Sequence, residues 1–324
     1  MKRMRVATAV IVILGAASGR AQADVLDLAL HRLLSPPAMG KPLDPENDEI
    51  AKAAYRQLTS ELGVVMAPRF LSPADTVGYS GFQFTVDGSF TTISNQACAA
   101  DNSADQCPWS RGMSGRDSHG VPHQLPSVAS TLTVMARKGI WLPMPSFELG
   151  AGVTKLMQSD LVALQVYGKL ALHEGFHRWP LPSLAVRGGA SRLLGTSQLD
   201  LTTVQIDSTI SLTRGIAGTV TIAPYLGAAA LLVIARGQVL DTTPSIDAYG
   251  GGPNSLDLNN NAVFPAQDTI VRWRFYGGLR LSYSVLVLTM DYALSARGSL
   301  MNSGAIADRS TDQHTLSISG GFLF

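Results

Sequence analysis

One short stretch of the sequence has the residue types and spacing of a zinc peptidase site. His173, Glu174 and His177 spell the pattern H-E-x-x-H. On a helix, two histidines four residues apart lie on one face and can share a metal ion. The glutamate then acts as general base toward a metal-bound water. This chemistry requires the pattern to be helical.

The residues around the pattern predict a strand and a turn instead of a helix. An alternating segment, 159–173, runs directly into it, and Gly175, Pro180 and Pro182 disfavour a helix. In an extended chain, residues four apart are separated by ~13 Å, too far to share one zinc ion. Glu174 is also the last glutamate of the chain, so a downstream glutamate ligand is excluded. We interpret the pattern as a chance match and expect no catalytic residue, no bound metal and no other cofactor.

The two cysteines are a second candidate for chemistry. Cys98 and Cys107 lie in one predicted loop, and in an exported protein they are expected to form a disulfide. His119 and His123 lie in the same loop, which leaves a Cys2His2 zinc site as the alternative.

The composition favours a membrane protein that lacks spanning helices. The chain has 324 residues, of which 46% are hydrophobic and 15% are charged, whereas soluble domains have roughly 25% charged residues. The formal net charge of +1 argues against a nucleic-acid binder. Because the only long apolar stretch is at the N-terminus, a transmembrane β-barrel is the leading prediction.

Residues 1–23 are predicted to be a signal peptide. Three basic residues precede an apolar stretch at 6–17, which is too short to span a bilayer, and Ala21-Gln22-Ala23 has the form of a cleavage site. An uncleaved N-terminal anchor is the alternative. Cleavage before Asp24 would remove four basic residues and no acidic one, which changes the formal net charge from +1 to −3.

Residues 24–75 are predicted to form a helical, periplasmic N-terminal segment. Asp44-Pro45 resembles the start of a helix, and Ile50, Ala54, Leu58 and Leu62 would form one apolar stripe that ends at Gly63. Because the stripe is short and its residues are small, we expect the helix to pack beneath the barrel. A plug that reaches into the lumen is the alternative.

Residues 76–324 are predicted to form an antiparallel transmembrane barrel of about ten strands, within a range of eight to twelve. Apolar and polar residues alternate with period two; Val204, Ile206 and Ile210, for example, oppose Gln205 and Asp207. The predicted strands are 77–94, 129–139, 145–157, 159–173, 183–195, 197–214, 219–238, 268–283, 284–297 and 311–324. If the last strand ends in the periplasm, the long connections 95–128, 239–267 and 298–310 lie outside the cell, as is usual for such barrels.

The last strand carries a family resemblance. Apolar residues occupy every second position before a terminal aromatic, at Leu316, Ile318, Phe322 and Phe324, with Gly320 as the departure from the pattern. This ending resembles the end strand of bacterial outer-membrane β-barrel proteins. The resemblance implies a location in the outer membrane of a Gram-negative bacterium, contact with its lipid, and recognition by the barrel-assembly machinery. It implies no particular substrate, subfamily or oligomeric state.

The inward positions of the predicted strands hold the remaining candidates. The lumen-lining candidates are Arg272, Arg274, Arg280, Asp207, Asp291, Glu148 and Lys169, and Asp87, Arg137 and Arg187 also point inward. A filled interior braced by ion pairs is the structural interpretation, because narrow barrels are filled by side chains. The functional interpretation is a narrow passage that favours anions, with Arg272, Arg274 and Arg280 as its selectivity element.

Three functions therefore compete. The first is a narrow pore or transporter for small solutes, and the second is a structural or surface-interaction barrel that acts through loops 95–128 and 239–267. The third is a barrel protease of the omptin type, for which the Asp117/His119 and Asp312/His314 pairs would have to lie at the extracellular rim. The chain has no omptin motif, and we expect it not to be an enzyme.

Overall fold

The computed structural model describes residues 24–34, 49–94, 108–115, 124–140, 146–174, 181–216, 219–241, 261–298 and 308–324. The predicted signal peptide, Cys98, Cys107, Asp117, His119 and His177 lie outside these described residues. Among the described residues, no helix is long and apolar enough to cross a membrane.

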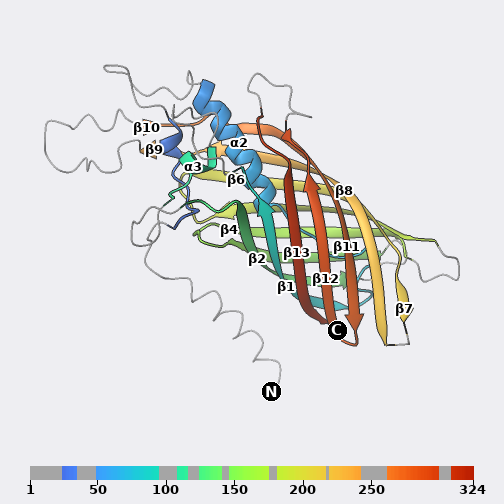
Figure 1. Ribbon diagram of the computed structural model, residues 1–324. Coiled ribbons are helices and arrows are strands. Elements are labelled where there is room, and N and C mark those ends of the chain that lie inside the picture. The colour runs from blue at the N-terminus through green and yellow to red at the C-terminus, as the bar shows by residue number, and fades with distance from the viewer. Residues whose placement is uncertain are drawn as a thin grey trace, which may run out of the picture.

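Ten long antiparallel strands form a closed barrel (Figure 1). Each strand pairs with its neighbours in sequence, and the pairings β11–β8 and β1–β13 complete the ring. The strands are β1 (Phe82–Thr92), β2 (Val128–Ile140), β3 (Ser146–Leu156), β4 (Val162–His173), β5 (Ser183–Leu194), β6 (Leu199–Ser211), β8 (Val220–Gly237), β11 (Gln267–Tyr283), β12 (Leu286–Ser295) and β13 (Gln313–Leu323). Short β7 (Arg214–Ile216) extends the edge of β8, and β9 (Leu240–Asp241) pairs with β10 (Asn261–Ala262). The predicted fold and all ten predicted strands are confirmed.

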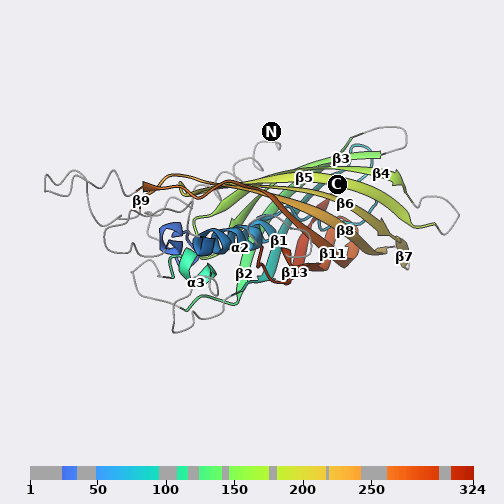
Figure 2. The same cartoon turned by 90° about the horizontal axis from the view of Figure 1, so that it is seen from above.

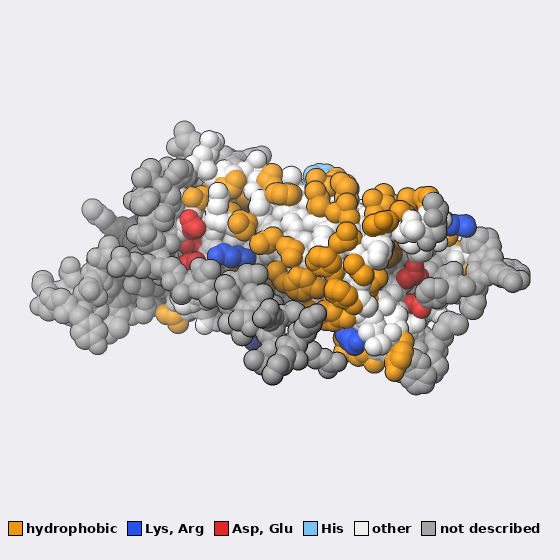
Figure 3. Space-filling view, turned by 90° about the horizontal axis from the view of Figure 1, so that it is seen from below, with side chains coloured by type: hydrophobic (Ala, Val, Ile, Leu, Met, Phe, Trp, Pro, Cys, Tyr) orange, Lys and Arg blue, Asp and Glu red, His pale blue; other side chains and the backbone are white. Residues whose placement is uncertain are grey.

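The two faces of the wall have opposite chemistry. On β6, Ile206 and Ile210 are exposed on the outside, whereas Gln205, Asp207 and Thr209 are buried inside. On the face of the barrel that Figure 3 shows, hydrophobic side chains gather in the middle of the outer surface. The outward charged residues on the strands lie within three residues of a strand end: Lys138, Lys155, Arg192, Asp200, Arg236 and Asp268. An apolar band between two charged rims is the surface that a bilayer requires.

The two ends of the barrel differ in their connections. At one end, 93–127, 238–266 and 296–312 join consecutive strands, and we call this the long-loop end. At the other, the short-turn end, only Ser284 and Val285 separate β11 from β12. The start of β1 meets the C-terminus there, where Phe82 and Phe324 exchange backbone hydrogen bonds of 2.9 and 2.8 Å.

Helix α2 (Glu49–Met66) lies inside the barrel at the long-loop end, beside η1 (Leu30–Leu33) and α3 (Pro108–Gly112) (Figures 1 and 2). The expectation that this segment packs beneath the barrel is wrong, and the alternative of a plug in the lumen is correct. Nearly all of α2 is buried, including Arg56, Ser60 and Glu61.

The predicted end of this helix was also wrong, because α2 continues past Gly63 to Met66. Gly63 allows α2 to lie close to the barrel wall. A Cβ atom at position 63 would lie 2.5 Å from Cγ1 of Val233 on β8. The missing side chain therefore lets the helix axis come near the strand.

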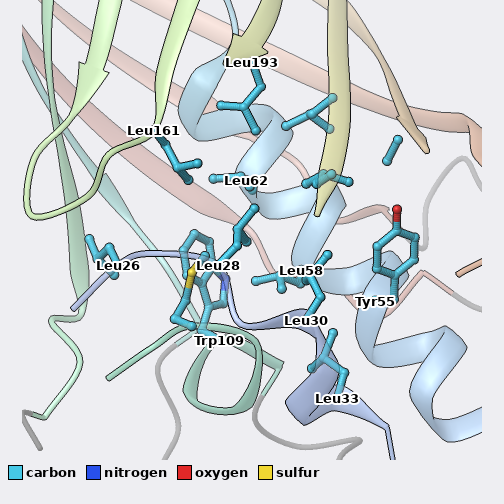
Figure 4. Packing of buried hydrophobic residues seen from close by; sticks show 14 of the residues in the cluster. Leu26, Leu28, Leu30, Leu33, Tyr55, Leu58, Leu62, Trp109, Leu161 and Leu193 are labelled. Atoms are coloured by element: carbon cyan, nitrogen blue, oxygen red, sulfur yellow. The ribbon is translucent and has the colours of Figure 1, made fainter. Parts of the chain in front are cut away.

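An apolar core closes the long-loop end. Leu58 and Leu62 of α2 pack with Leu30 and Leu33 of η1 and with Trp109 of α3 (Figure 4). Wall residues of the same cluster complete it: Ala129, Leu156, Ala163, Leu193, Leu199, Leu201, Val233, Ala235 and Ile270. The strands that carry these residues, β2 to β6, β8 and β11, have apolar inward side chains at this end, whereas Thr91, Ser295 and Gln313 keep the inner face of β1, β12 and β13 polar there.

Candidate functional site

The candidate site is the polar part of the lumen, which the chain itself occupies. After α2 ends, residues 67–77, here called the threaded segment, run from the long-loop end toward the start of β1 at the short-turn end. Three basic wall side chains donate hydrogen bonds to its carbonyl oxygens. These are Arg274 to Pro68 (3.2 Å), Arg187 to Phe70 and Ser72 (3.3 and 2.9 Å), and Lys169 to Pro73 and Asp75 (3.2 and 3.0 Å).

Acidic wall side chains accept hydrogen bonds from the end of the same segment. Glu148 accepts the amide of Val77 at 2.8 Å. Glu174 accepts the amide and hydroxyl of Thr76 at 2.8 and 2.7 Å on one carboxylate oxygen, and the hydroxyl of Ser146 at 2.8 Å on the other. The glutamate of the H-E-x-x-H pattern thus holds the threaded segment, and the pattern begins on a strand, since β4 ends at His173. That the pattern is catalytically silent stays a prediction.

The wall also completes the C-terminal end of α2. A helix leaves its last four carbonyl groups without partners inside the helix, and they carry partial negative charge. Wall residues from four strands donate to carbonyl oxygens in the last turns of α2: Gln313 to Glu61 (3.4 Å), Thr203 to Gly63 (3.4 Å), Arg274 to Val64 (3.0 Å) and Ser191 to Met66 (2.9 Å). The barrel thus satisfies three of the last four carbonyl oxygens, and Arg69 donates to the fourth, that of Val65, at 3.3 Å.

Glu61 ties α2 to the connections at the long-loop end. Its carboxylate is fully buried and accepts hydrogen bonds from the indole nitrogen of Trp109 at 2.7 Å, from the amide of Ser94 at 3.1 Å and from the amide of Thr311 at 3.1 Å. Nearby, burial raises the pKa of Tyr55, whose ring stacks on Phe264 with centroids 4.5 Å apart.

All seven lumen-lining candidates are buried inside the barrel, with exposed fractions of 7% or less. Two pairs form salt bridges, Arg187 with Asp207 at 2.7 Å and Lys169 with Glu148 at 3.4 Å. The arginine row does not act as one unit. Arg272 and Arg274 bind the helix, Arg272 by a 3.0 Å bond to the hydroxyl of Ser60, whereas Arg280 lies nearer the short-turn end.

The threaded segment is also held by ring contacts. Phe70 stacks on Tyr167 with centroids 4.8 Å apart, and the guanidinium of Arg187 lies 5.3 Å from the centroid of Phe70. Gly189 makes room for this ring, because a Cβ atom there would lie 2.7 Å from Cζ of Phe70. Beside the segment, Arg69, Arg274, Tyr276 and Asp291 help to line a cavity of about 20 Å³, which is room for one water molecule.

The residues of the plug that make these contacts were not predicted from sequence, above all Glu61, Phe70 and the carbonyls of the threaded segment. One signal could have found them. The predicted inward face carries six basic residues, Arg137, Lys169, Arg187, Arg272, Arg274 and Arg280, against four acidic ones, Asp87, Glu148, Asp207 and Asp291. A surplus of buried cations requires other acceptors, and the backbone of the plug supplies them.

Of the four residues considered for a protease, Asp312 and His314 lie among the described residues. Both make contacts with neighbouring side chains or backbone. Asp312 accepts the backbone amide of Arg297 at 2.6 Å and pairs with its guanidinium at 3.0 Å, and the Arg297 hydrogen bond lowers the pKa of Asp312. Nδ1 of His314 lies 2.7 Å from the hydroxyl of Tyr292, on the outer face of the wall.

A closed barrel with an even number of antiparallel strands, an apolar outer band and a polar interior is an outer-membrane β-barrel. The chain therefore resides in the outer membrane of a Gram-negative bacterium, in contact with its lipid.

No family model matches the chain, and no curated protein matches it. Solved structures of bacterial barrels do. An outer-membrane channel from Pseudomonas putida F1 is 11% identical, with 78% of this chain and 98% of that chain covered and a TM-score of 0.34. LpxR from Salmonella typhimurium is 9% identical (76% and 99% covered, TM-score 0.32), and Neisserial surface protein A is 13% identical (75% and 95% covered, TM-score 0.27).

Proposed function

We propose that this barrel is a narrow pore for small solutes, closed at rest by its own N-terminal segment. One observation carries the proposal: α2 and the threaded segment occupy the lumen and bind the same charged wall residues that would line a passage. Arg274, Arg187 and Lys169 all donate to backbone carbonyls of this segment. Water can replace each of those bonds when the segment moves.

The resting state is closed because the apolar core at the long-loop end holds α2 firmly. Burial of a Leu side chain contributes ~1.5–3 kcal/mol, so Leu58 and Leu62 alone stabilise the closed state by about 3–6 kcal/mol. Opening then requires a trigger or a weakened core. With the plug displaced, the surplus of inward basic residues would favour the passage of anions.

Conductance of the purified full-length chain in planar bilayers tests this proposal. The wild type is expected to be almost silent. Replacing Leu58 and Leu62 with Asp places two carboxylates in the apolar core, which should expel α2 and give frequent, anion-favouring openings. The control is Ile50→Asp on the exposed start of the same helix, which should stay silent.

If the Leu58→Asp, Leu62→Asp variant folds, as judged by heat-modifiable gel mobility, and conducts no more than the wild type, the pore proposal is wrong. The protein is then a structural or surface-interaction barrel.

We propose no catalytic role. Glu174, Asp312 and His314 are each engaged in contacts that position the threaded segment or the wall. We also propose that the barrel-assembly machinery recognises the last strand. Leu316, Ile318, Phe322 and Phe324 all point outward from β13 and its end, which supports this role.

A further inference from the structure

The lipid-facing side of the wall has a hollow of about 720 Å³ across strands β2 to β6. Small outward residues line its middle: Ala136, Ala151, Gly168, Gly188 and Ala190. Ala136 lies directly opposite Ala151, and Gly168 lies directly opposite Gly188. Larger outward side chains flank them, namely Leu149, Val166 and Ile206. The hollow has the size of a pocket for a small ligand, roughly 300–1,000 Å³.

The packing of the wall does not require its two glycines. A Cβ atom at position 168 would lie 3.5 Å from the nearest atoms, in the ring of Phe147, and one at position 188 would lie 3.9 Å from the backbone oxygen of Gln205. Both are ordinary contact distances, and neither glycine is among the described glycines with a positive φ. Glycine weakens a strand and often marks a place where a ligand approaches closely. The hollow therefore favours an occupant from outside the wall.

One cation lies at the edge of this apolar hollow. Lys138 is the charged outward side chain among the lining residues, and it is two residues from Ile140, where β2 ends at the short-turn end. Its ammonium donates to the carbonyl oxygen of Ser80 at 2.6 Å, the one hydrogen bond that it makes within the described residues. An ammonium has three donors, so it can also bind an anion. A lysine can lay its apolar stem along the wall while its charge reaches the headgroups of the bilayer.

We propose that the hollow binds one phospholipid of the periplasmic leaflet, with an acyl chain along the small residues and its phosphate on Lys138. The short-turn end of such a barrel faces the periplasm, which places the cation at the depth of that leaflet's phosphates. Lysine binds phosphate as a point charge, and the apolar lining matches a hydrocarbon chain.

A second copy of the chain is the weaker candidate for the occupant. In a two-fold dimer the same patch of each subunit meets itself, so two hollows would face each other and stay unfilled. The hollow lies on the outside of the barrel and the plug lies inside. The lipid site and the pore can therefore be tested separately.

Native mass spectrometry of the full chain in mild detergent tests the site. The wild type extracted from membranes should retain one phospholipid, and after its removal the barrel should bind dioleoylphosphatidylglycerol. Gly168→Leu combined with Gly188→Leu fills the hollow and should lower that affinity at least about tenfold, because the acyl chain loses its contacts with the wall. Gly88→Leu is the matched control. It lies on the outward face of β1 with no atom within 4 Å of its Cβ position, and it should bind as the wild type does. Heat-modifiable gel mobility verifies that each variant folds.

The lysine has its own readout. Lys138→Gln should lower the affinity for dioleoylphosphatidylglycerol about fivefold. It should also abolish the preference for this lipid over dioleoylglycerol, which has the same chains but no phosphate. Lys155→Gln, an outward lysine at the long-loop end of β3, should keep the preference.

Three results would each overturn the proposal. The first is equal binding by the wild type and the double leucine variant, and the second is an unchanged lipid preference in Lys138→Gln. The third is a wild-type dimer that the double leucine variant converts to a monomer, which would make the hollow an interface between copies of the chain.

Discussion

Two arginine–aspartate pairs on the same two strands differ in their burial and in the further contacts of the arginine, since Arg187 also donates to the carbonyl oxygens of Phe70 and Ser72. Arg187 pairs with Asp207 at 2.7 Å inside the barrel, and Arg192 pairs with Asp200 at 2.9 Å on the outside, all on β5 and β6. The inner side chains are 2% and 0% exposed, the outer ones 65% and 29%. Water screens the outer pair, whereas the inner pair has no water to replace a lost partner.

Replacing each arginine with Gln should therefore give unequal losses. Arg187→Gln is expected to lower the free energy of unfolding by about 3–5 kcal/mol, because Asp207 stays buried and unpaired. Arg192→Gln should cost about 1 kcal/mol or less. Denaturant unfolding of the detergent-folded barrel, followed by circular dichroism, measures both. Equal losses would mean that the inner pair does not stabilise the plugged lumen.

The inward charged residues show how far the role of a side chain can be predicted from sequence. Alternation placed Asp207, Glu148, Lys169 and Arg274 on the inner face, and all four are buried there. Their partners could not be read from the strands, because Arg274 and Lys169 bind carbonyl groups of residues distant in sequence. Every residue type has a backbone carbonyl, so residue type cannot identify a backbone acceptor. Only the excess of inward basic residues over acidic ones indicated that such acceptors were needed.

Among the elements, β13 closes the barrel against β1 and carries the outward aromatic ending. Phe324 is 70% exposed and bonds to Phe82 only through its backbone. Its ring is thus free to be recognised by another protein, while its loss should leave the closing hydrogen bonds intact.

Phe324→Ala is accordingly expected to lower the amount of folded barrel in the outer membrane severalfold without lowering the stability of the protein that does fold. Cell fractionation with heat-modifiable gel mobility gives the first quantity and urea unfolding the second. Phe275→Ala on β11 is the matched control, since Phe275 is also an outward, exposed aromatic. Should both variants reach the membrane at wild-type levels, recognition of the C-terminal ring is excluded.

The elements also separate what sequence can predict from what it cannot. All ten wall strands follow from period-two alternation, because every residue of a barrel wall faces either lipid or lumen. The existence of α2 followed from its apolar spacing, but its place did not. An amphipathic stripe specifies that one face is buried, not which surface buries it. The polar residues Arg56, Ser60 and Glu61 would be solvated on a peripheral helix but are buried in this one.

In the molecule as a whole, the two ends of the described chain lie at opposite ends of the barrel, and the threaded segment runs between these ends. Residues 24–34 lie at the long-loop end, where Leu26 bonds to the β3–β4 turn at Gln158 and Asp27 accepts the amide of Asp160. The C-terminal Phe324 lies at the short-turn end, beside the start of β1. The chain therefore passes through the lumen once before it forms the wall.

This arrangement gives the protein a sidedness that can be measured. Long loops of outer-membrane barrels face the outside of the cell and short turns face the periplasm, so the start of α2 should be extracellular. Glu49 has a side chain that is 70% exposed, and Val285 is an exposed residue of the β11–β12 turn at the opposite end.

In a chain with Cys98 and Cys107 replaced by Ser, Glu49→Cys should react with a membrane-impermeant maleimide on intact cells. Val285→Cys should react only after the outer membrane is permeabilised. Labelling of Val285→Cys but not Glu49→Cys on intact cells would mean that the barrel is inserted the other way, with the long-loop end and the start of α2 in the periplasm. Protection of both until permeabilisation would mean that α2 is covered in the cell.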